Sequence, residues 1–195
     1  MVSPLSNFVT NVTRTNETFI GNTWDSFVTR ENQGEGKISG TEISYQQPFS
    51  FLTGALEGFG IIANFTFANG EQTLNNGSPI AFPGVSEFSF NSALYYDKGG
   101  RFNARLAYTY RDQFLILAND VFGQEQWVAD YGQLDASASY KISDVISVFG
   151  EAINLSNSRN KLFSTNASSP AFNFERPISV EHVGMQLGFG VRATF

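Results

Sequence analysis

The sequence has no cysteine and only one histidine among its 195 residues. Without cysteine there is no disulfide framework, no thiolate nucleophile and no cysteine-based metal site. His182 stands beside Glu181 with no further metal-ligating side chain in sequence reach, so we assign it to a loop or a rim. With one such histidine a Ser-His-Asp triad is not available either, and we expect no enzyme, no catalytic residue, no cofactor and no metal.

Charge is also scarce, because charged residues make up 15% of the chain, against about 25% in an ordinary globular protein. The net charge of -6 repels phosphate backbones and argues against a nucleic-acid partner. A hydrophobic content of 42%, with 20 phenylalanines, excludes disorder. Such a chain has enough apolar surface to form either a packed core or a surface that faces lipid.

Long apolar runs are missing as well. No window of about 18 apolar residues occurs, so the sequence predicts no transmembrane helix. The first residues lack the basic segment and apolar run of a signal peptide. Two interpretations remain at this point: a soluble protein, or a membrane β-protein whose signal and N-terminal part are missing from this chain.

Strict alternation of apolar and polar residues is the dominant pattern that is present, and it is typical of β-strands. Over residues 183–195 every second side chain is apolar. The same pattern recurs in the ranges 37–47, 58–68, 86–97, 101–111, 133–142 and 145–155, with weaker candidates at 5–13 and 24–30. The sequence therefore predicts an all-β chain of eight or nine antiparallel strands without a helix.

The connections between these strands alternate in length. Residues 97–100 and 142–144 have the chemistry of tight turns, whereas 69–84, 112–130 and 156–178 are long polar stretches. Long strands joined in this way are typical of an up-and-down transmembrane barrel. A soluble barrel with an apolar interior would alternate equally well. Strand length, aromatics near the strand ends and polar faces poor in lysine favour the membrane barrel.

Three segments resemble the C-terminal part of the β-barrel of TonB-dependent outer-membrane receptors. They are residues 36–46 (GKISGTEISYQ), the hairpin 131–157 and the closing strand 188–195 (GFGVRATF). The resemblance covers residues 24–195, and residues 1–23 carry only a weak assignment. It implies that the whole of 1–195 is a partial barrel from a 22-stranded family, with the signal peptide and plug domain absent from this chain.

The resemblance also implies a location in the outer membrane of a Gram-negative bacterium and active uptake of a scarce siderophore, vitamin or oligosaccharide. The implied partners are outer-membrane lipid, the barrel-assembly machinery, the small-molecule nutrient and, through the missing plug only, the TonB system. We do not expect this chain alone to transport. Two alternatives stay open: a stand-alone small outer-membrane barrel of structural or adhesive type, and a soluble lipocalin-like binding barrel.

Candidate functional residues follow from the resemblance and from the alternation. The resemblance assigns the terminal Phe195, with Val191 and Phe189, to the signal that the assembly machinery reads, as an edge strand that adds to a partner edge. Five charged side chains on polar faces are candidates for the barrel lumen: Glu42, Arg105, Asp135, Glu151 and Arg192. These side chains either steer a solute or pair with one another, and we favour pairing.

The long stretches 112–130 and 156–178 are candidates for the extracellular loops that contact the ligand. Trp127, Phe163 and Arg176 are the side chains we single out, because aromatic rings beside hydrogen-bonding groups suit sugars or siderophore-like molecules. The alternative is that the aromatic rings of these loops pack on one another at the mouth of the barrel, and the sequence leaves both possibilities open.

Overall fold

The computed structural model describes residues 2–6, 9–14, 16–25, 27–32, 35–73, 77, 79–118, 124–166 and 174–194. Throughout these ranges the chain is all-β, with antiparallel strands and one short 3-10 segment, η1 (Gly54–Gly58). This confirms the predicted fold class. The described residues contain no helix with the length and apolarity needed to cross a bilayer.

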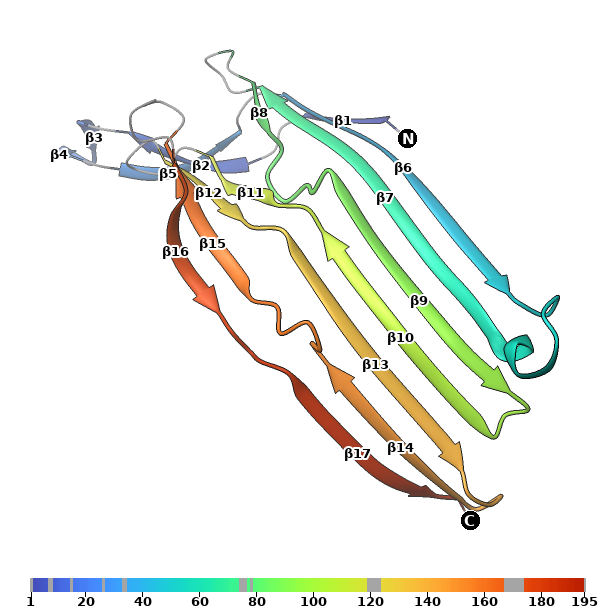
Figure 1. The fold of residues 1–195 in the computed structure, drawn as a ribbon. Helices are drawn as coiled ribbons and strands as arrows, with labels where there is room; N and C mark the ends of the chain where they lie inside the picture. The colour runs from blue at the N-terminus through green and yellow to red at the C-terminus, as the bar shows by residue number, and fades with distance from the viewer. Residues whose placement is uncertain are drawn as a thin grey trace.

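The main sheet has nine strands, and eight of them form one continuous series of hydrogen-bonded neighbours (Figure 1). Its order is β1 (Val2–Ser6), β6 (Glu35–Pro48), β7 (Phe59–Thr73), β9 (Phe88–Lys98), β10 (Phe102–Arg111), β13 (Tyr131–Lys141), β14 (Ile146–Ile153) and β17 (Gln186–Ala193), with β8 (Pro79–Ala81) beside β7. Strands β6, β7, β9, β10 and β13 have 10 to 15 residues each, longer than the five or six residues typical of globular strands.

Local chemistry explains the tight turns at one end of the main sheet. Between β9 and β10, Gly99 and Gly100 have φ of +66° and +64°, and the Asp97 carboxylate accepts a hydrogen bond of 3.3 Å from the Gly100 amide. Between β13 and β14, the Ser143 hydroxyl accepts hydrogen bonds from the amides of Val145 and Ile146. Both turns therefore lie where the sequence predicts them, and they fix the register of the strands that they join.

The opposite end of the main sheet continues into a second antiparallel sheet of four strands. Its strands are β11 (Phe114–Leu117), β12 (Glu125–Val128), β15 (Asn160–Thr165) and β16 (Arg176–Glu181). The prediction that 112–130 and 156–178 are loops is wrong for these strands. Each of them prolongs a strand of the main sheet past a short break, so the hairpins reach beyond the predicted strand ends (Figure 1).

Two further hairpins lie in the N-terminal part of the chain. Strand β2 (Val9–Arg14) pairs with β5 (Phe27–Asn32), and β3 (Glu17–Phe19) pairs with β4 (Asn22–Trp24). The weak predictions of strands at 5–13 and 24–30 fall mainly on β2 and β5. The strand predicted from residue 183 begins later, at Gln186, because Gly184 has a φ of +80° that a strand does not accommodate.

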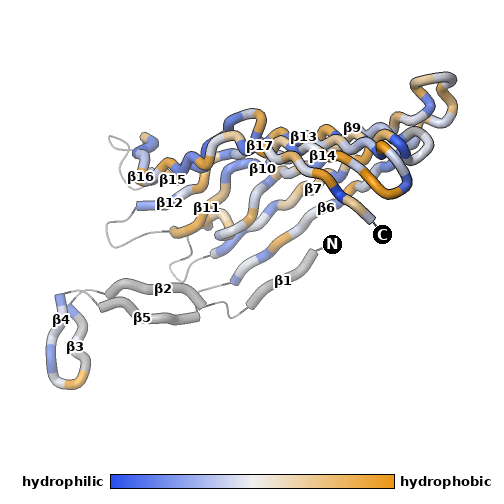
Figure 2. The backbone as a smooth tube through the Cα atoms, turned by 90° about the horizontal axis from the view of Figure 1, so that it is seen from below, coloured by the Kyte–Doolittle hydropathy of each residue, from blue (hydrophilic) through white to orange (hydrophobic). Residues whose placement is uncertain are grey.

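The main sheet is a single curved layer with two separate edges (Figure 2). Strand β1 lies at one edge and β17 at the other, and no strand pairing joins them within the described residues. Buried apolar side chains are correspondingly few in the described part of the chain: Ala63, Ala93, Leu115 and Phe163. The stability of such a layer depends on whatever covers its faces and edges, because the strands alone enclose almost no core.

Candidate functional site

The register of the main sheet separates an apolar face from a polar face. One row of paired residues crosses six strands, from β7 to β17, without a polar side chain: Ile61, Leu94, Leu106, Ala136, Ala152 and Leu187. The adjacent row lies on the other face: Gly60, Tyr95, Arg105, Ser137, Glu151 and Gly188. The alternation in the sequence is therefore aligned across the strands, and we refer to these surfaces as the apolar face and the polar face.

The apolar face has no covering layer in the described part of the chain. On β17, Phe189 is 92% exposed, and Val191 and Leu187 are 69% and 68% exposed. Leu94, Leu106 and Ile43 are also exposed, although they lie well inside the sheet. Contiguous apolar surface of this extent marks a contact with another protein or with lipid.

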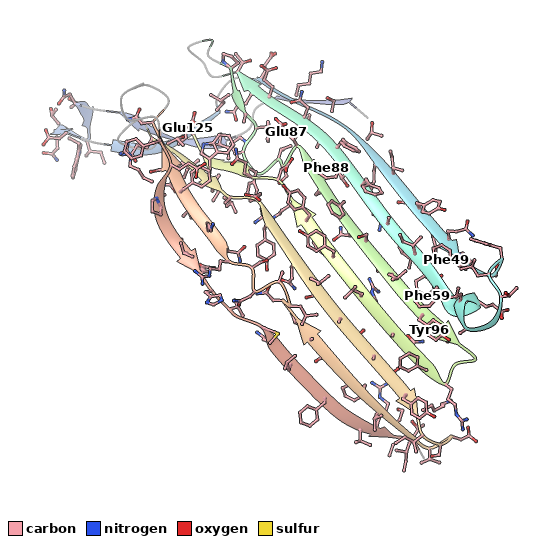
Figure 3. The ribbon with its side chains drawn as sticks, viewed as in Figure 1. Phe49, Phe59, Glu87, Phe88, Tyr96 and Glu125 are labelled. Atoms are coloured by element: carbon pink, nitrogen blue, oxygen red, sulfur yellow. The ribbon has the colours of Figure 1, made fainter. Side chains whose placement is uncertain are left out.

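Aromatic rings mark both ends of the apolar face. At the end toward the second sheet, six rings form a cluster with centroid distances between 5.0 and 6.2 Å: Phe65, Phe67, Phe88, Phe90, Tyr108 and Tyr110. At the end with the tight turns, the Tyr96 ring lies 4.8 Å from that of Phe59 and 5.8 Å from that of Phe102. Figure 3 shows Phe88 near one end and Phe59 and Tyr96 near the other.

The spacing of the two aromatic groups agrees with the thickness of a membrane. Phe102 and Tyr108 are six residues apart on β10, which corresponds to about 20 Å along the strand. The apolar band of an outer-membrane barrel is about 25 Å tall and has aromatic girdles at both boundaries. Between the two groups the apolar face carries mainly leucine, isoleucine and alanine, with Ser92 as a polar residue among them.

The polar face holds the five charged residues that the sequence singled out for the lumen. Arg105 and Glu151 lie in the same row on either side of Ser137, two strands and about 10 Å apart. Glu42 is paired with Thr66. The Arg192 guanidinium lies 5.9 Å from the centroid of the Phe149 ring. No ion pair joins these residues in the part of the chain that the structure describes, and their roles in the lumen stay a prediction.

Asp135, the fifth of these residues, belongs to a hydrogen-bonded network at the start of β13. Its carboxylate accepts hydrogen bonds of 2.8 and 3.1 Å from the Gln133 amide group, and Gln133 in turn accepts one from the Tyr131 hydroxyl. It also accepts a hydrogen bond of 2.9 Å from the backbone amide of Asn154. Asp135 therefore ties β13 to the end of β14.

Asn154 is a site residue that the sequence analysis missed. Its side chain is 4% exposed, and its backbone has a φ of +58°. The side-chain amide donates to the backbone oxygens of Ser158 at 3.1 Å and Gly184 at 3.2 Å, and its oxygen accepts from the Ser158 amide at 2.8 Å. The sequence signal for this junction was limited to the position of Asn154 at the end of the predicted strand 145–155.

The three candidates for ligand contact lie on strands of the second sheet. Trp127 on β12 is paired with Phe163 on β15, and Phe163 with Pro177 on β16. The Trp127 indole donates a hydrogen bond of 3.2 Å to the Glu125 carboxylate. The Arg176 guanidinium lies 5.1 Å from the centroid of the Phe174 ring. Phe163 is buried, which leaves little of its ring accessible to a ligand, and the assignment of the three residues to ligand contact stays a prediction.

Trp127 also lines a cavity of about 440 Å³ between β7, β10 and β12. Tyr110 and the acidic residues Glu87, Asp112 and Asp130 line the same cavity. Glu87 and Glu125 both lie at the end of the molecule that carries the second sheet (Figure 3). No group of three or more His, Asp or Glu side chains among the described residues is arranged to hold a metal ion.

The predicted assembly signal is only partly visible. Phe189 and Val191 point outward from the apolar face on β17, the edge strand of the main sheet. The third member, Phe195, lies outside the described residues. The assignment of the three residues to assembly stays a prediction.

Comparisons with known proteins show the family of this chain. Residues 5–155 match the protein family described as "TonB dependent receptor-like, beta-barrel", and the chain belongs to that family. No curated protein matches the chain.

Among solved structures, the chain is similar to the siderophore receptor PiuA from Acinetobacter baumannii, with a TM-score of 0.57 and 20% sequence identity. The likeness covers 85% of this chain and 23% of that chain. At this identity the likeness shows the fold alone. The chain spans about a quarter of the length of the receptor that it matches.

Proposed function

We propose that this chain forms part of the wall and the extracellular end of a TonB-dependent receptor in the outer membrane of a Gram-negative bacterium. The observation that carries the proposal is the uncovered apolar face, bounded by aromatic rings at both ends and backed by a polar face. In such a receptor the apolar face contacts lipid and the polar face lines the lumen. The tight turns lie on the periplasmic side and the second sheet lies outside the cell.

The whole receptor, on this proposal, imports a scarce nutrient. The name of the solved relative, a siderophore receptor, supports a siderophore-like molecule over a vitamin or an oligosaccharide. Trp127 is the side chain of this chain best placed to contact it, because it lines a cavity at the extracellular end. Arg105 and Glu151 have no ion-pair partner in the described chain, and they are available to a plug domain or to the solute.

Assembly is the third part of the proposal. Strand β17 is an edge strand of the main sheet, so one side of its backbone is open to pairing with a partner strand, and its apolar side chains are exposed. Phe189, Val191 and the terminal Phe195 are the side chains that we assign to recognition by the barrel-assembly machinery.

The proposal is tested by locating the receptor and measuring its uptake. We expect the receptor in the outer-membrane fraction, and we expect that deleting its gene abolishes uptake of a radiolabelled ferric siderophore while the intact gene restores it. Trp127→Ala lowers the apparent affinity for uptake about tenfold if the ring contacts the solute. Phe51→Ala, an exposed aromatic at the other end of the sheet, serves as the matched control and leaves the affinity unchanged.

A protein that stays in the soluble fraction without detergent would contradict the membrane location and favour a soluble binding barrel. An outer-membrane protein whose deletion changes the uptake of no siderophore, vitamin or oligosaccharide would contradict the transport function and favour a structural role.

A further inference from the structure

A pocket of about 540 Å³ opens where β10 and β13 meet the segment between β14 and β15. Its lining combines three tyrosines, hydroxyl groups, one carboxylate and two basic side chains, among them Tyr108, Tyr110, Tyr131, Asp130, Arg159 and Lys161. Arg159, Lys161 and Asp130 are exposed, and no ion pair involving them occurs within the described ranges. The three charged groups leave a net charge of +1 at the pocket.

The pocket lies on the same side of the sheet as the apolar face. The rings of Tyr108 and Tyr110 belong to the aromatic cluster, with centroids 5.6 and 5.7 Å from that of Phe90. Because Phe90 is in the apolar face, Tyr108 and Tyr110 open the pocket toward that face, whereas Tyr131, which also lines the pocket, pairs with Arg111 in the register of the polar face. The basic residues therefore lie just past the aromatic boundary of the apolar face, where hydrocarbon gives way to polar groups.

The segment that carries the basic side chains is held firmly in place. The Asn154 side chain exchanges two hydrogen bonds with the backbone of Ser158, and the Ser158 hydroxyl donates to the backbone oxygen of Gly132. The Asn157 side chain is hydrogen-bonded to the His182 ring at 2.8 Å. The pocket is thus formed before anything binds, so a ligand loses little affinity to ordering of the segment.

From this geometry we infer that the pocket binds the phosphorylated sugar headgroup of an outer-leaflet lipid. The inference rests on the proposed function, because it requires the apolar face to lie in the outer membrane. Arg159 and Lys161 supply charge for the phosphate, and the acyl chains continue along the apolar face. Basic groups at a membrane surface each favour binding of an anionic headgroup.

A soluble anion is a poorer occupant than a lipid. The pocket is open and its net charge is only +1, so an anion without acyl chains gains little there. A lipid adds the burial of its chains against the exposed apolar side chains below the tyrosines, and each buried CH₂ group strengthens binding. The continuity of the pocket with the apolar face therefore selects a lipid.

The test uses the complete receptor purified in detergent and a bis-phosphorylated glucosamine disaccharide lipid as the probe. We expect the double variant Arg159→Gln/Lys161→Gln to bind this lipid at least tenfold more weakly than the parent receptor. Arg101→Gln/Lys141→Gln removes the same two charges at the opposite end of the sheet and leaves binding unchanged. The dephosphorylated lipid binds the parent receptor as weakly as the intact lipid binds the double variant.

Equal binding of the lipid to the parent and the double variant would overturn the inference, and so would an equal loss in the control variant. Inorganic phosphate that competes fully with the lipid at millimolar concentration would show a site for free anions instead. None of these results touches the proposed function, which fails separately if the receptor is absent from the outer membrane or transports nothing.

Discussion

Single glycines shape both faces of the main sheet, because each lies beneath an aromatic ring of the neighbouring strand. On the polar face the Tyr95 ring lies over Gly60, and the Phe149 ring lies over Gly190. On the apolar face Tyr108 lies over Gly132. A side chain on any of these glycines would occupy the space of the ring. Such cross-strand pairs place rings flat along the sheet and pin its register.

We predict that Gly60→Ala lowers the free energy of unfolding by about 1–3 kcal/mol, because the new methyl group overlaps the Tyr95 ring and forces it to move. Gly150→Ala is the matched control, since a methyl group there meets only the Gly188 oxygen at 3.7 Å. Urea titration of the purified receptor in lipid vesicles measures both values. Equal stability of the two variants, or no recovery when Tyr95→Ala is added to Gly60→Ala, would show that the ring is not the obstacle.

At Asn154, one buried residue joins three segments of the chain. Its side-chain amide donates hydrogen bonds to the backbone oxygens of Ser158 and Gly184, and its backbone amide donates to the Asp135 carboxylate. Its φ of +58° suits asparagine and glycine better than other residues. Conformation and hydrogen bonding thus select the same residue type at this position.

For Asn154→Ala we expect a loss of about 2–4 kcal/mol in the free energy of unfolding, because the strained backbone stays and buried polar groups lose their partners. Asn157 has a similar φ of +52° but is exposed and has one side-chain hydrogen bond, so Asn157→Ala should cost no more than about 1–2 kcal/mol. The same urea titration compares them. A smaller loss for Asn154 than for Asn157 would contradict the role of Asn154 as a junction.

At the scale of the strands, alternation in the sequence predicted where most strands lie and which side chains share a face. Strand β10 at 102–111 and β13 at 131–141 differ from the predicted ranges by one or two residues at either end. The face assignments hold because successive side chains of a strand point to opposite faces of the sheet, so every second residue lies on the same face. Five charged residues were placed on the polar face for the same reason.

The second sheet could not be predicted from the same pattern. Strand β11 reads Phe-Leu-Ile-Leu and has no alternation of apolar and polar residues, although Leu115 is 1% exposed and Ile116 is 44% exposed. The hydrogen bond from the Gly84 amide to the Leu115 oxygen at 2.8 Å links segments 31 residues apart. The junction at Asn154 likewise depends on Gly184, a contact of long range that local sequence does not encode.

The apolar face provides a prediction at the scale of the strand. Leu106 lies midway along β10 and Phe102 lies at its turn end. Arginine costs about 2–4 kcal/mol at the middle of the bilayer and about 0–1 kcal/mol near its boundary. We therefore expect Leu106→Arg to lower the free energy of unfolding in vesicles by about 1–4 kcal/mol more than Phe102→Arg. Equal losses of stability for the two variants would show that Leu106 and Phe102 do not lie at different depths in a membrane.

At the scale of the whole molecule, the described part of the main sheet forms a curved layer (Figure 2). Within the described residues its two edge strands are not paired with each other, few apolar side chains are buried, and the apolar face has no covering layer. A soluble protein would fold such a surface inward, since a contiguous apolar surface of this size in water promotes aggregation. The arrangement is stable where lipid covers one face and further strands complete the barrel.

The most direct test of this account is the accessibility of single cysteines introduced into this chain, which has no cysteine of its own. Leu94→Cys and Leu106→Cys report the apolar face, and Thr109→Cys and Ser137→Cys report the polar face. In the intact receptor within outer membranes, we expect a water-soluble maleimide to label the Thr109 and Ser137 variants and to spare the two leucine variants. All four are labelled after denaturation. Rapid labelling of the leucine variants, with protection of the other two, would mean that the apolar side faces water or the lumen and would contradict the account.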